Sequence, residues 1–110
     1  MTEARVKTEI RVSAHVRIAQ AAGAFATIVR RGDPDAGAVA VKLYIGPGAV
    51  KLYTQSRDLD GGQIWREPFE GDASPDIESK IDTWLAKEVR IDPDLWVVEI
   101  EDRQGRAFLE

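Results

Sequence analysis

The chain has 110 residues, of which 44% are hydrophobic and 31% are charged. This length fits a single domain, residues 1–110, with a core that needs no metal or disulfide staples, and the composition excludes a wholly disordered chain. The absence of cysteine excludes disulfides, thiolate metal sites and cysteine nucleophiles. No apolar run approaches the roughly 18 residues of a bilayer span, and the N-terminus lacks a signal-peptide pattern. These features predict a soluble cytoplasmic protein.

The formal net charge of −4 is divided unevenly along the chain. Residues 1–55 contain eight Lys or Arg against four Asp or Glu, whereas residues 56–110 contain seven against fifteen. Such segregation is compatible with a charged partner on one side. We prefer the simpler interpretation that the two halves interleave in one sheet and neutralise each other.

The N-terminal third predicts an extended segment, a helix and a strand. Alternating apolar residues favour an extended chain over 6–12. Ala-rich sequence between Ser13, a good N-cap, and Gly23, a good C′ residue, favours a helix over 13–22. Residues 24–31 are apolar at both alternating sets of positions, which predicts a strand buried on both faces.

The clearest local feature is a repeated Val-Lys-Leu-Tyr tetrapeptide at residues 41–44 and 50–53, separated by a Pro-Gly turn. This pattern predicts a β-hairpin whose first strand covers residues 38–45. Counting outward from the turn pairs Leu43 with Leu52 on one face and places both lysines and both tyrosines on the other.

The second half predicts a loop over 55–63, a short strand over 64–68 and a long helix with Ser74 as its N-cap and Pro75 in its first turn. The helix has a single apolar stripe, with acidic residues early and basic residues late, as the helix dipole prefers. The stripe consists of Ile77, Ile81, Trp84, Leu85 and Val89.

The stretch 92–102 predicts a central strand. Asp92 and Pro93 end the preceding helix, and the following residues are apolar on both faces. Its Trp96, Val98 and Ile100 face is expected to pack beneath the 77–89 helix. A tight turn after it predicts a final strand over 106–109.

Together these elements predict an α+β fold. The expected architecture is a single, mostly antiparallel sheet of about five to six strands packed with two helices. A three-layer α/β sandwich is the alternative.

The first candidate site is one face of the predicted hairpin, which we call the Lys/Tyr face. Its members are Lys42, Tyr44, Lys51 and Tyr53, with Arg30 and Arg31 nearby in sequence. Tyrosine rings stack on bases and lysines neutralise phosphates, so this face is a candidate for single-stranded nucleic acid. Alternatively, a helix covers the tyrosines while the lysine stems extend to solvent.

Two acidic patterns have features of metal sites. Residues 56–67 have the spacing of a calcium loop, but Ser56 occupies its first position and Pro68 prevents a smooth exiting helix. The second pattern is a group of carboxylates around the last strand, which alternation on a solvated face explains equally well. These carboxylates are Asp92, Asp94, Glu99, Glu101 and Asp102. We predict no metal and no cofactor.

His15 is the single histidine of the chain. On a helix it points away from Ser13, its nearest hydroxyl, so a catalytic dyad is not expected. The chain also lacks a glycine-rich phosphate loop, a nucleophile elbow and a two-histidine metal motif. We therefore predict no catalytic residue, which leaves enzymes without these motifs open.

Two stretches carry a family resemblance. The first runs from AGAF at residues 22–25 to VRRGDPDAGA at 29–38, and the second is DPDLWVVEIEDR at 92–103. They resemble a family of small alphaproteobacterial proteins of unknown function, DUF family 1491. The resemblance covers most of the chain and implies a bacterial cytoplasmic protein, but it brings no activity and no assigned residues.

Three functions are compatible with these observations. The first is a non-catalytic binding or adaptor domain that presents a surface to a protein partner. The second is a nucleic-acid-associated protein that uses the Lys/Tyr face, and the third is a metal-assisted hydrolase that uses the C-terminal carboxylates. No membrane partner is expected, and the sequence leaves the oligomeric state open.

Overall fold

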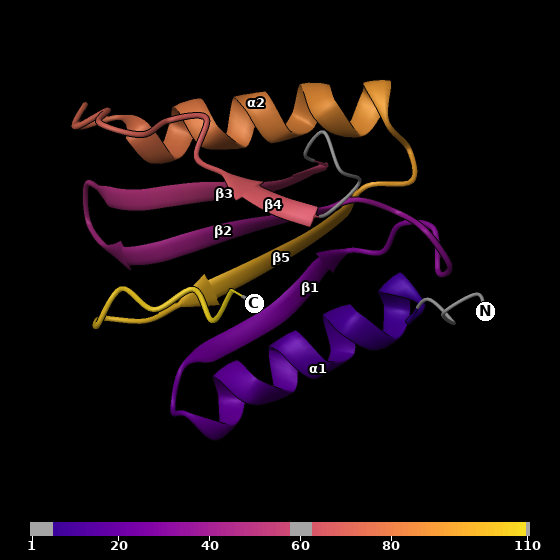
Figure 1. Cartoon of the computed structure of the whole chain (residues 1–110). Helices are drawn as coiled ribbons and strands as arrows, with labels where there is room; N and C mark the ends of the chain where they lie inside the picture. The colour runs from indigo at the N-terminus through magenta and orange to yellow at the C-terminus, as the bar shows by residue number, and fades with distance from the viewer. Residues whose placement is uncertain (1–5, 58–62, 110) are drawn as a thin grey trace.

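Two helices pack against opposite faces of one five-stranded sheet (Figure 1). The computed structural model describes residues 6–57 and 63–109. In chain order the elements are α1 (Thr8–Ala21), β1 (Phe25–Arg30), β2 (Val39–Gly46), β3 (Ala49–Arg57), β4 (Gln63–Arg66), α2 (Ile77–Ile91) and β5 (Trp96–Glu101). The predicted α+β fold is confirmed, and its layers are helix, sheet and helix. Neither of these two helices combines the length and apolar character that crossing a bilayer requires.

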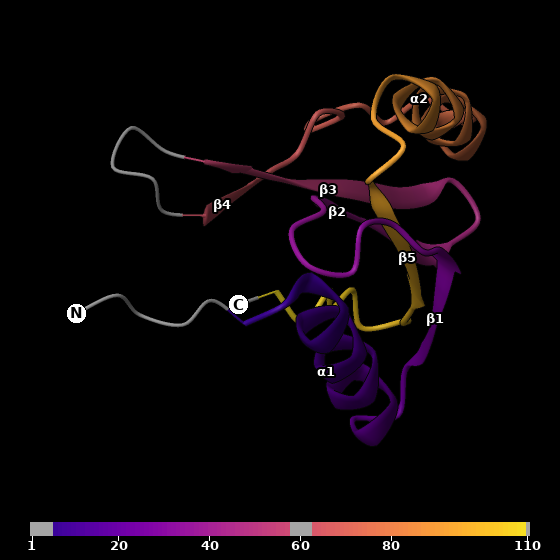
Figure 2. The same cartoon turned by 90° about the vertical axis from the view of Figure 1, so that its right-hand side faces the viewer.

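The last strand of the chain lies inside the sheet, as its apolar faces predict. The strand order is β1-β5-β2-β3-β4. Neighbouring strands are antiparallel except β2 and β5, which run parallel. A parallel pair needs a crossover connection, and here α2 provides it by carrying the chain over one face of the sheet (Figure 2). The basic first half and the acidic second half of the chain therefore interleave.

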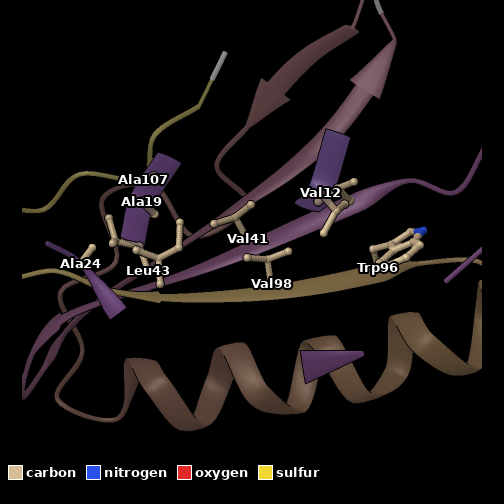
Figure 3. Close-up of a cluster of buried hydrophobic side chains, with 10 residues drawn as sticks. Val12, Ala19, Ala24, Val41, Leu43, Trp96, Val98 and Ala107 are labelled. Carbon is tan, nitrogen blue, oxygen red and sulfur yellow. The ribbon is translucent and has the colours of Figure 1, made fainter. Parts of the chain in front are cut away.

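Alternate residues of β2 and β5 fill two separate cores. The α1-side core, shown in Figure 3, contains Val12, Ala19, Ala24, Val39, Val41, Leu43, Trp96, Val98, Ile100 and Ala107. The α2-side core contains Ala40, Val50, Leu52, Ile77, Ile81, Leu85, Leu95 and Val97. The predicted apolar stripe of α2 is confirmed, because each of its five residues packs in or against this second core.

The predicted position of the Trp96, Val98 and Ile100 face is wrong. These side chains point toward α1, and Leu95 and Val97 lie beneath α2 instead. Alternation along a strand shows which residues share a face. It does not show which helix covers that face, because the crossover decides that.

Helix α1 begins at Thr8, so the prediction of an extended segment over 6–12 is wrong. The buried side chains of α1 are Thr8, Val12, His15 and Ala19. They have helical spacing, but two of the four are polar, so the apolar pattern does not reveal them. Thr8 Oγ1 donates to the Gly37 carbonyl oxygen at 3.1 Å. The alternating Ile10 and Ile18 are exposed.

The hairpin β2–β3 is confirmed, but its register differs from the prediction. Gly46 pairs with Ala49 at the turn as counted, whereas Tyr44 pairs with Val50. Ile45 is thus an extra residue in β2, a β-bulge, and every pair beyond it is shifted by one. A one-residue shift moves side chains to the opposite face relative to their partners.

Strand β1 lies at the rim of the sheet, and the prediction that both of its faces are buried is wrong. Ala26 and Ile28 pack against the α1-side core. Phe25, Thr27 and Val29 are exposed, because α2 lies over the opposite part of the sheet (Figure 2).

The predicted final strand over 106–109 does not form. Asp102 Oδ2 accepts a hydrogen bond from the Arg106 backbone N–H at 2.8 Å, which closes a turn directly after β5. The segment then crosses the α1 side, where Ala107 enters the core and Phe108 takes a positive φ of 56°. His15 Nε2 lies 2.7 Å from the Ala107 carbonyl oxygen. The C-terminal segment therefore contacts His15 of α1 instead of pairing with a strand.

Trp96 joins β5 to the loop between β1 and β2. Its ring is 1% exposed, and its Nε1–H donates to the Asp33 carbonyl oxygen at 2.7 Å. The Arg31 guanidinium lies 5.0 Å from the centre of the ring. A Cβ atom on Gly32 or Gly37 would overlap the backbone carbonyl of Asp94, so glycine allows the loop to approach β5.

We expect Trp96→Ala to lower the free energy of unfolding by about 3–5 kcal/mol, because it empties a buried aromatic site. Trp96→Phe retains most of the packing but loses the indole donor, so its loss should be about 1–3 kcal/mol. Urea denaturation measures both, with Ile91→Ala, at an exposed position, as the control. An unchanged midpoint for Trp96→Ala would contradict this packing.

Candidate functional site

The structure divides the predicted Lys/Tyr face between the two faces of the sheet. Lys42 and Tyr44 lie on the α2 side, and Tyr44 packs against the α2-side core. Lys51 pairs with Leu43, which lies on the α1 side, and Tyr53 packs against the α1-side core. The bulge at Ile45 causes this division. The prediction that the four side chains share one face is wrong.

The two nearby arginines also have structural contacts. Arg30 Nη1 donates to the carbonyl oxygens of Pro93 at 2.9 Å and Leu95 at 2.7 Å. Arg31 pairs with Glu9 at 3.1 Å and covers the ring of Trp96. Both guanidinium groups therefore fasten β1 and its following loop to neighbouring elements.

Lys42 is buried and lies among carboxylates of α2. Its Nζ donates to Glu78 Oε2 and to Asp82 Oδ1, each at 2.8 Å. Glu99 of β5 is its cross-strand neighbour in the parallel pair. Burial by itself lowers the pKa of Lys42. The hydrogen bonds that Lys42 donates to Asp82 and Glu78, with the charge of Glu99, outweigh burial and raise this pKa above its ordinary value of 10.5.

A lysine in this state remains a protonated ammonium near neutral pH. Nucleophilic lysines need a lowered pKa instead. The cluster of Lys42, Glu78, Asp82 and Glu99 therefore serves to attach α2 to the sheet through charge pairing.

Tyr53 is the second side chain of the predicted site with a shifted pKa. Burial and, secondarily, the charge of Glu67 raise this pKa above its ordinary value of 10.0. The phenol is therefore held in its neutral form over a wide pH range. Tyr53 packs against the α1-side core, as Trp65 does.

The C-terminal carboxylates do not converge. Asp92 accepts a hydrogen bond from the Asp94 backbone N–H at 3.1 Å, and Glu101 is exposed at the end of β5. Within residues 6–57 and 63–109, no three His, Asp or Glu side chains are grouped closely enough to hold a metal ion. The calcium-loop pattern at 56–67 falls largely on positions outside the described residues.

Asp102 and Arg106 form a close ion pair at the end of β5. Asp102 Oδ2 accepts from Arg106 Nε at 2.8 Å, and Oδ1 accepts from Nη2 at 3.0 Å. These hydrogen bonds lower the pKa of Asp102 to about 2 and raise that of Arg106. Arg106 Nη2 also donates to the Ala22 carbonyl oxygen at 3.3 Å, just after α1. One side chain thus ties together α1, β5 and the C-terminal segment.

A groove of about 540 Å³ lies at this end of the molecule, and we call it the end groove. The end of α1, the start of β1, the β2–β3 turn and the segment after β5 form its walls. Its lining includes the side chains of Phe25, Ile45, Pro47, Glu101, Arg103 and Arg106. Ligand pockets in proteins commonly measure about 300–1,000 Å³. The end groove is therefore large enough for a small molecule or a few residues of a peptide.

Phe25 is the residue of the end groove for which the sequence predicted the wrong environment. Its ring is 75% exposed, yet it stands in a strand whose apolar pattern predicted burial. Arg103 and Arg106 appeared only as turn and strand residues. No local signal identifies them, because their role depends on where β5 and α1 end relative to each other.

The chain has relatives of known structure that share its overall fold. A family model described as a protein of unknown function, DUF1491, matches residues 6–110. The chain belongs to the DUF1491 family. Among curated proteins, none matches the chain.

Solved structures of DUF1491 proteins share this fold. The crystal structure of a DUF1491 family protein from Caulobacter crescentus CB15 is 42% identical, covers 96% of this chain and 95% of its own, and has a TM-score of 0.84. An NMR structure of a DUF1491 family protein from Caulobacter crescentus CB15 is 42% identical over 97% of this chain and 94% of its own, with a TM-score of 0.83. The solution structure of protein Atu0922 from A. tumefaciens is 32% identical over 89% and 86%, with a TM-score of 0.71. None of these names states an activity or a ligand.

The raised pKa of Lys42 predicts a stability difference at alkaline pH. Its charged form is favoured in the folded state, so its contribution is present below the ordinary pKa of 10.5 and is lost as the pH rises through the folded pKa. We expect the difference in urea midpoint between the wild type and Lys42→Met to be constant up to about pH 10 and to shift against the wild type above it. A difference that stays constant to about pH 12 would contradict the charge pairing.

The lowered pKa of Asp102 predicts the opposite pH dependence. Its stabilising contribution is present above the ordinary value of 3.8 and is lost as the pH falls through the folded value of about 2. Asp102→Asn should therefore lower the urea midpoint at neutral pH, and the deficit should shrink between about pH 4 and about pH 2. Asp94→Asn, at an exposed carboxylate, is the matched control. A deficit that persists undiminished at the lower pH would show that the charge of Asp102 is not the cause.

Proposed function

We propose that this DUF1491 protein is a non-catalytic binding domain that receives a short extended segment of a partner protein in the end groove. The observation that carries the proposal is Phe25, a residue that is 75% exposed while it lines this groove. A large aromatic ring left in water is unfavourable unless another surface covers it. A partner side chain that packs on the ring would supply that cover.

The lining of the end groove specifies the chemistry of the segment. Phe25, Ile45 and Pro47 offer an apolar wall. Glu101 and Arg103 make no ion pair with any residue that the structure describes, and the charges of Asp102 and Arg106 cancel. The groove therefore suits an apolar anchor residue flanked by polar or charged groups. Hydrogen bonds at the rim would add specificity.

The walls of the groove are already held in place. Arg106 binds both Asp102 and the Ala22 carbonyl oxygen, and the bulged turn of β2 supplies the opposite wall. A preformed site lowers the ordering cost of binding. This arrangement supports recognition of a segment without a large conformational change.

Binding is favoured over catalysis because the reactive side chains lie elsewhere. His15 is buried on the α1 side with its Nε2 on a backbone carbonyl, and Lys42 is held as an ammonium on the α2 side. The nucleic-acid alternative gains no comparable support, since the carboxylates of α2 neutralise Lys42. A cytoplasmic location, which suits the cysteine-free composition, is part of the proposal.

A peptide library displayed on phage tests the proposal. Peptides selected on the wild type should carry an aliphatic or aromatic anchor, and a fluorescein-labelled copy gives the Kd by fluorescence polarisation. We expect Phe25→Ser to weaken this Kd at least about tenfold, since truncating a central aromatic contact commonly costs 1.4 kcal/mol or more. Arg103→Glu should weaken peptides that carry an acidic residue beside the anchor.

The matched control is Ile18→Ser, at an exposed apolar residue of α1 outside the groove. This variant should bind as the wild type does. Thermal melts confirm that each variant is folded. Selection of no peptide, or equal affinity in the wild type and Phe25→Ser, would refute binding in the end groove.

A further inference from the structure

An acidic side chain lies between two aromatic ones in the end groove. Glu101 of β5 pairs with Phe25 of β1 on one side and with Tyr44 of β2 on the other. Paired residues of neighbouring strands point to the same face of a sheet. The three side chains therefore form a row across three strands, and all three line the end groove. We call them the aromatic-acid row.

The aromatic-acid row lies on the α2 side of the sheet but is not covered by α2. Tyr44 packs against the α2-side core and is half-buried. Because α2 lies over β3 (Figure 2), Glu101 is exposed and Phe25 is 75% exposed. A ligand can therefore reach the carboxylate and the open parts of both rings from solvent.

The carboxylate of Glu101 has no cation bound to it. In the described part of the chain, none of the ion pairs includes Glu101. Arg106 is held by Asp102 and by the Ala22 carbonyl oxygen, and Arg103 lies past the end of β5. Carboxylates and the faces of aromatic rings both attract cations. The row thus combines two kinds of group that favour a positive charge.

The neighbouring charges on this face also favour a cation. The next paired row contains Glu99 and Lys42. Lys42 already binds Glu78 and Asp82 of α2, so these three carboxylates outnumber the lysine among them. The field of this part of the sheet therefore attracts a positively charged group toward Glu101.

We propose that the aromatic-acid row binds the guanidinium of an arginine side chain in the partner segment. This inference rests on the proposed function, because the arginine belongs to the segment that the end groove receives. A guanidinium is flat, stacks on aromatic rings and donates two parallel hydrogen bonds to one carboxylate. The ammonium of lysine is a compact, strongly hydrated charge and gains less from such a site.

The spacing of the row suits a flat cation. Neighbouring strands are about 4.7–4.9 Å apart, so the Cα atoms of Phe25 and Tyr44, two strands apart, are about 9–10 Å apart. A flat group in contact with two rings needs them about 7–8 Å apart, since carbon atoms in contact are separated by about 3.5–4.0 Å. A guanidinium therefore fits between the rings with its N–H groups directed at Glu101.

The arginine and the apolar anchor of the segment occupy different parts of the end groove. Ile45 packs against the α1-side core, whereas Tyr44 packs on the α2 side. A segment that crosses this end of the sheet places its apolar anchor against Ile45 and Pro47 and its arginine on the aromatic-acid row. Phe25 contributes to both positions.

The amide derivative of N-acetylarginine tests the row without any partner. Amide NMR spectra of the protein, recorded during titration with this probe, should show saturable shifts at Phe25, Tyr44 and Glu101. N-acetylcitrulline amide has nearly the same shape without the charge, and we expect it to bind at least about tenfold more weakly. N-acetyllysine amide should also bind more weakly than the arginine probe.

Two variants separate the contributions of the carboxylate and of the rings. Glu101→Gln keeps the size of the side chain but removes its charge, so it should weaken the Kd of the arginine probe at least about tenfold. Tyr44→Leu keeps an apolar contact but removes the ring, and a loss of about threefold or more is expected. Glu70→Gln, at an exposed carboxylate outside the groove, is the matched control and should bind as the wild type does. Thermal melts check that each variant is folded.

The inference is overturned if the arginine probe shows no saturation up to about 0.1 M, far above the Kd of even a weak specific site. Equal affinities for the arginine and citrulline probes, or for the wild type and Glu101→Gln, overturn it too. Tighter binding of the lysine probe would overturn the choice of a guanidinium.

The peptide selection distinguishes this inference from the proposed function. Selected peptides should carry an arginine near their apolar anchor. Peptides that lack arginine but lose affinity in Phe25→Ser would overturn the inference and leave the proposed function intact. Saturable binding of the arginine probe without selection of any peptide would support the guanidinium site and refute the peptide-binding function.

Discussion

The insertion of β5 between β1 and β2 is the constraint on which the rest of the structure depends. Because β5 is an interior strand, its alternate side chains enter two cores, and each helix acquires a sheet face to cover. The parallel pairing with β2 requires α2 to cross the sheet before β5 begins. That crossing places the carboxylates of α2 over Lys42. The same insertion pushes β1 to the rim, beyond the reach of α2, and leaves its outer face exposed.

A single extra residue in β2 determines which side chains share a face of the hairpin. Ile45 forms the bulge that separates two lysine and tyrosine pairs which the sequence would otherwise place side by side. Lys42 and Tyr44 then lie on the α2 side, and Lys51 and Tyr53 lie on the α1 side. Ile45 itself lines the end groove and lies beside Gly105 of the C-terminal turn. The predicted Lys/Tyr face therefore does not form, and the hairpin instead contributes a wall of the end groove.

The proposed binding surface arises where the helices leave the sheet uncovered. The end groove lies past the last turn of α1, and Arg106 fixes its shape through Asp102 and the Ala22 carbonyl. The outer face of β1 lies beyond α2. Phe25 stands where the end groove meets the uncovered face of β1. Recognition in this small fold thus depends on incomplete burial instead of on a reactive group.

The sequence by itself determined the α+β class, the apolar stripe of α2, the hairpin and the interior position of β5. These features rest on local periodicity and turn chemistry, which neighbouring residues encode. Only the tertiary structure decided the start of α1, since its buried stripe includes Thr8 and His15, whose partners lie far along the chain. It also decided the face of Trp96, the loss of the final strand and the exposure of Phe25. Each of these depends on which elements meet in space, and periodicity along one element carries no information about its neighbours.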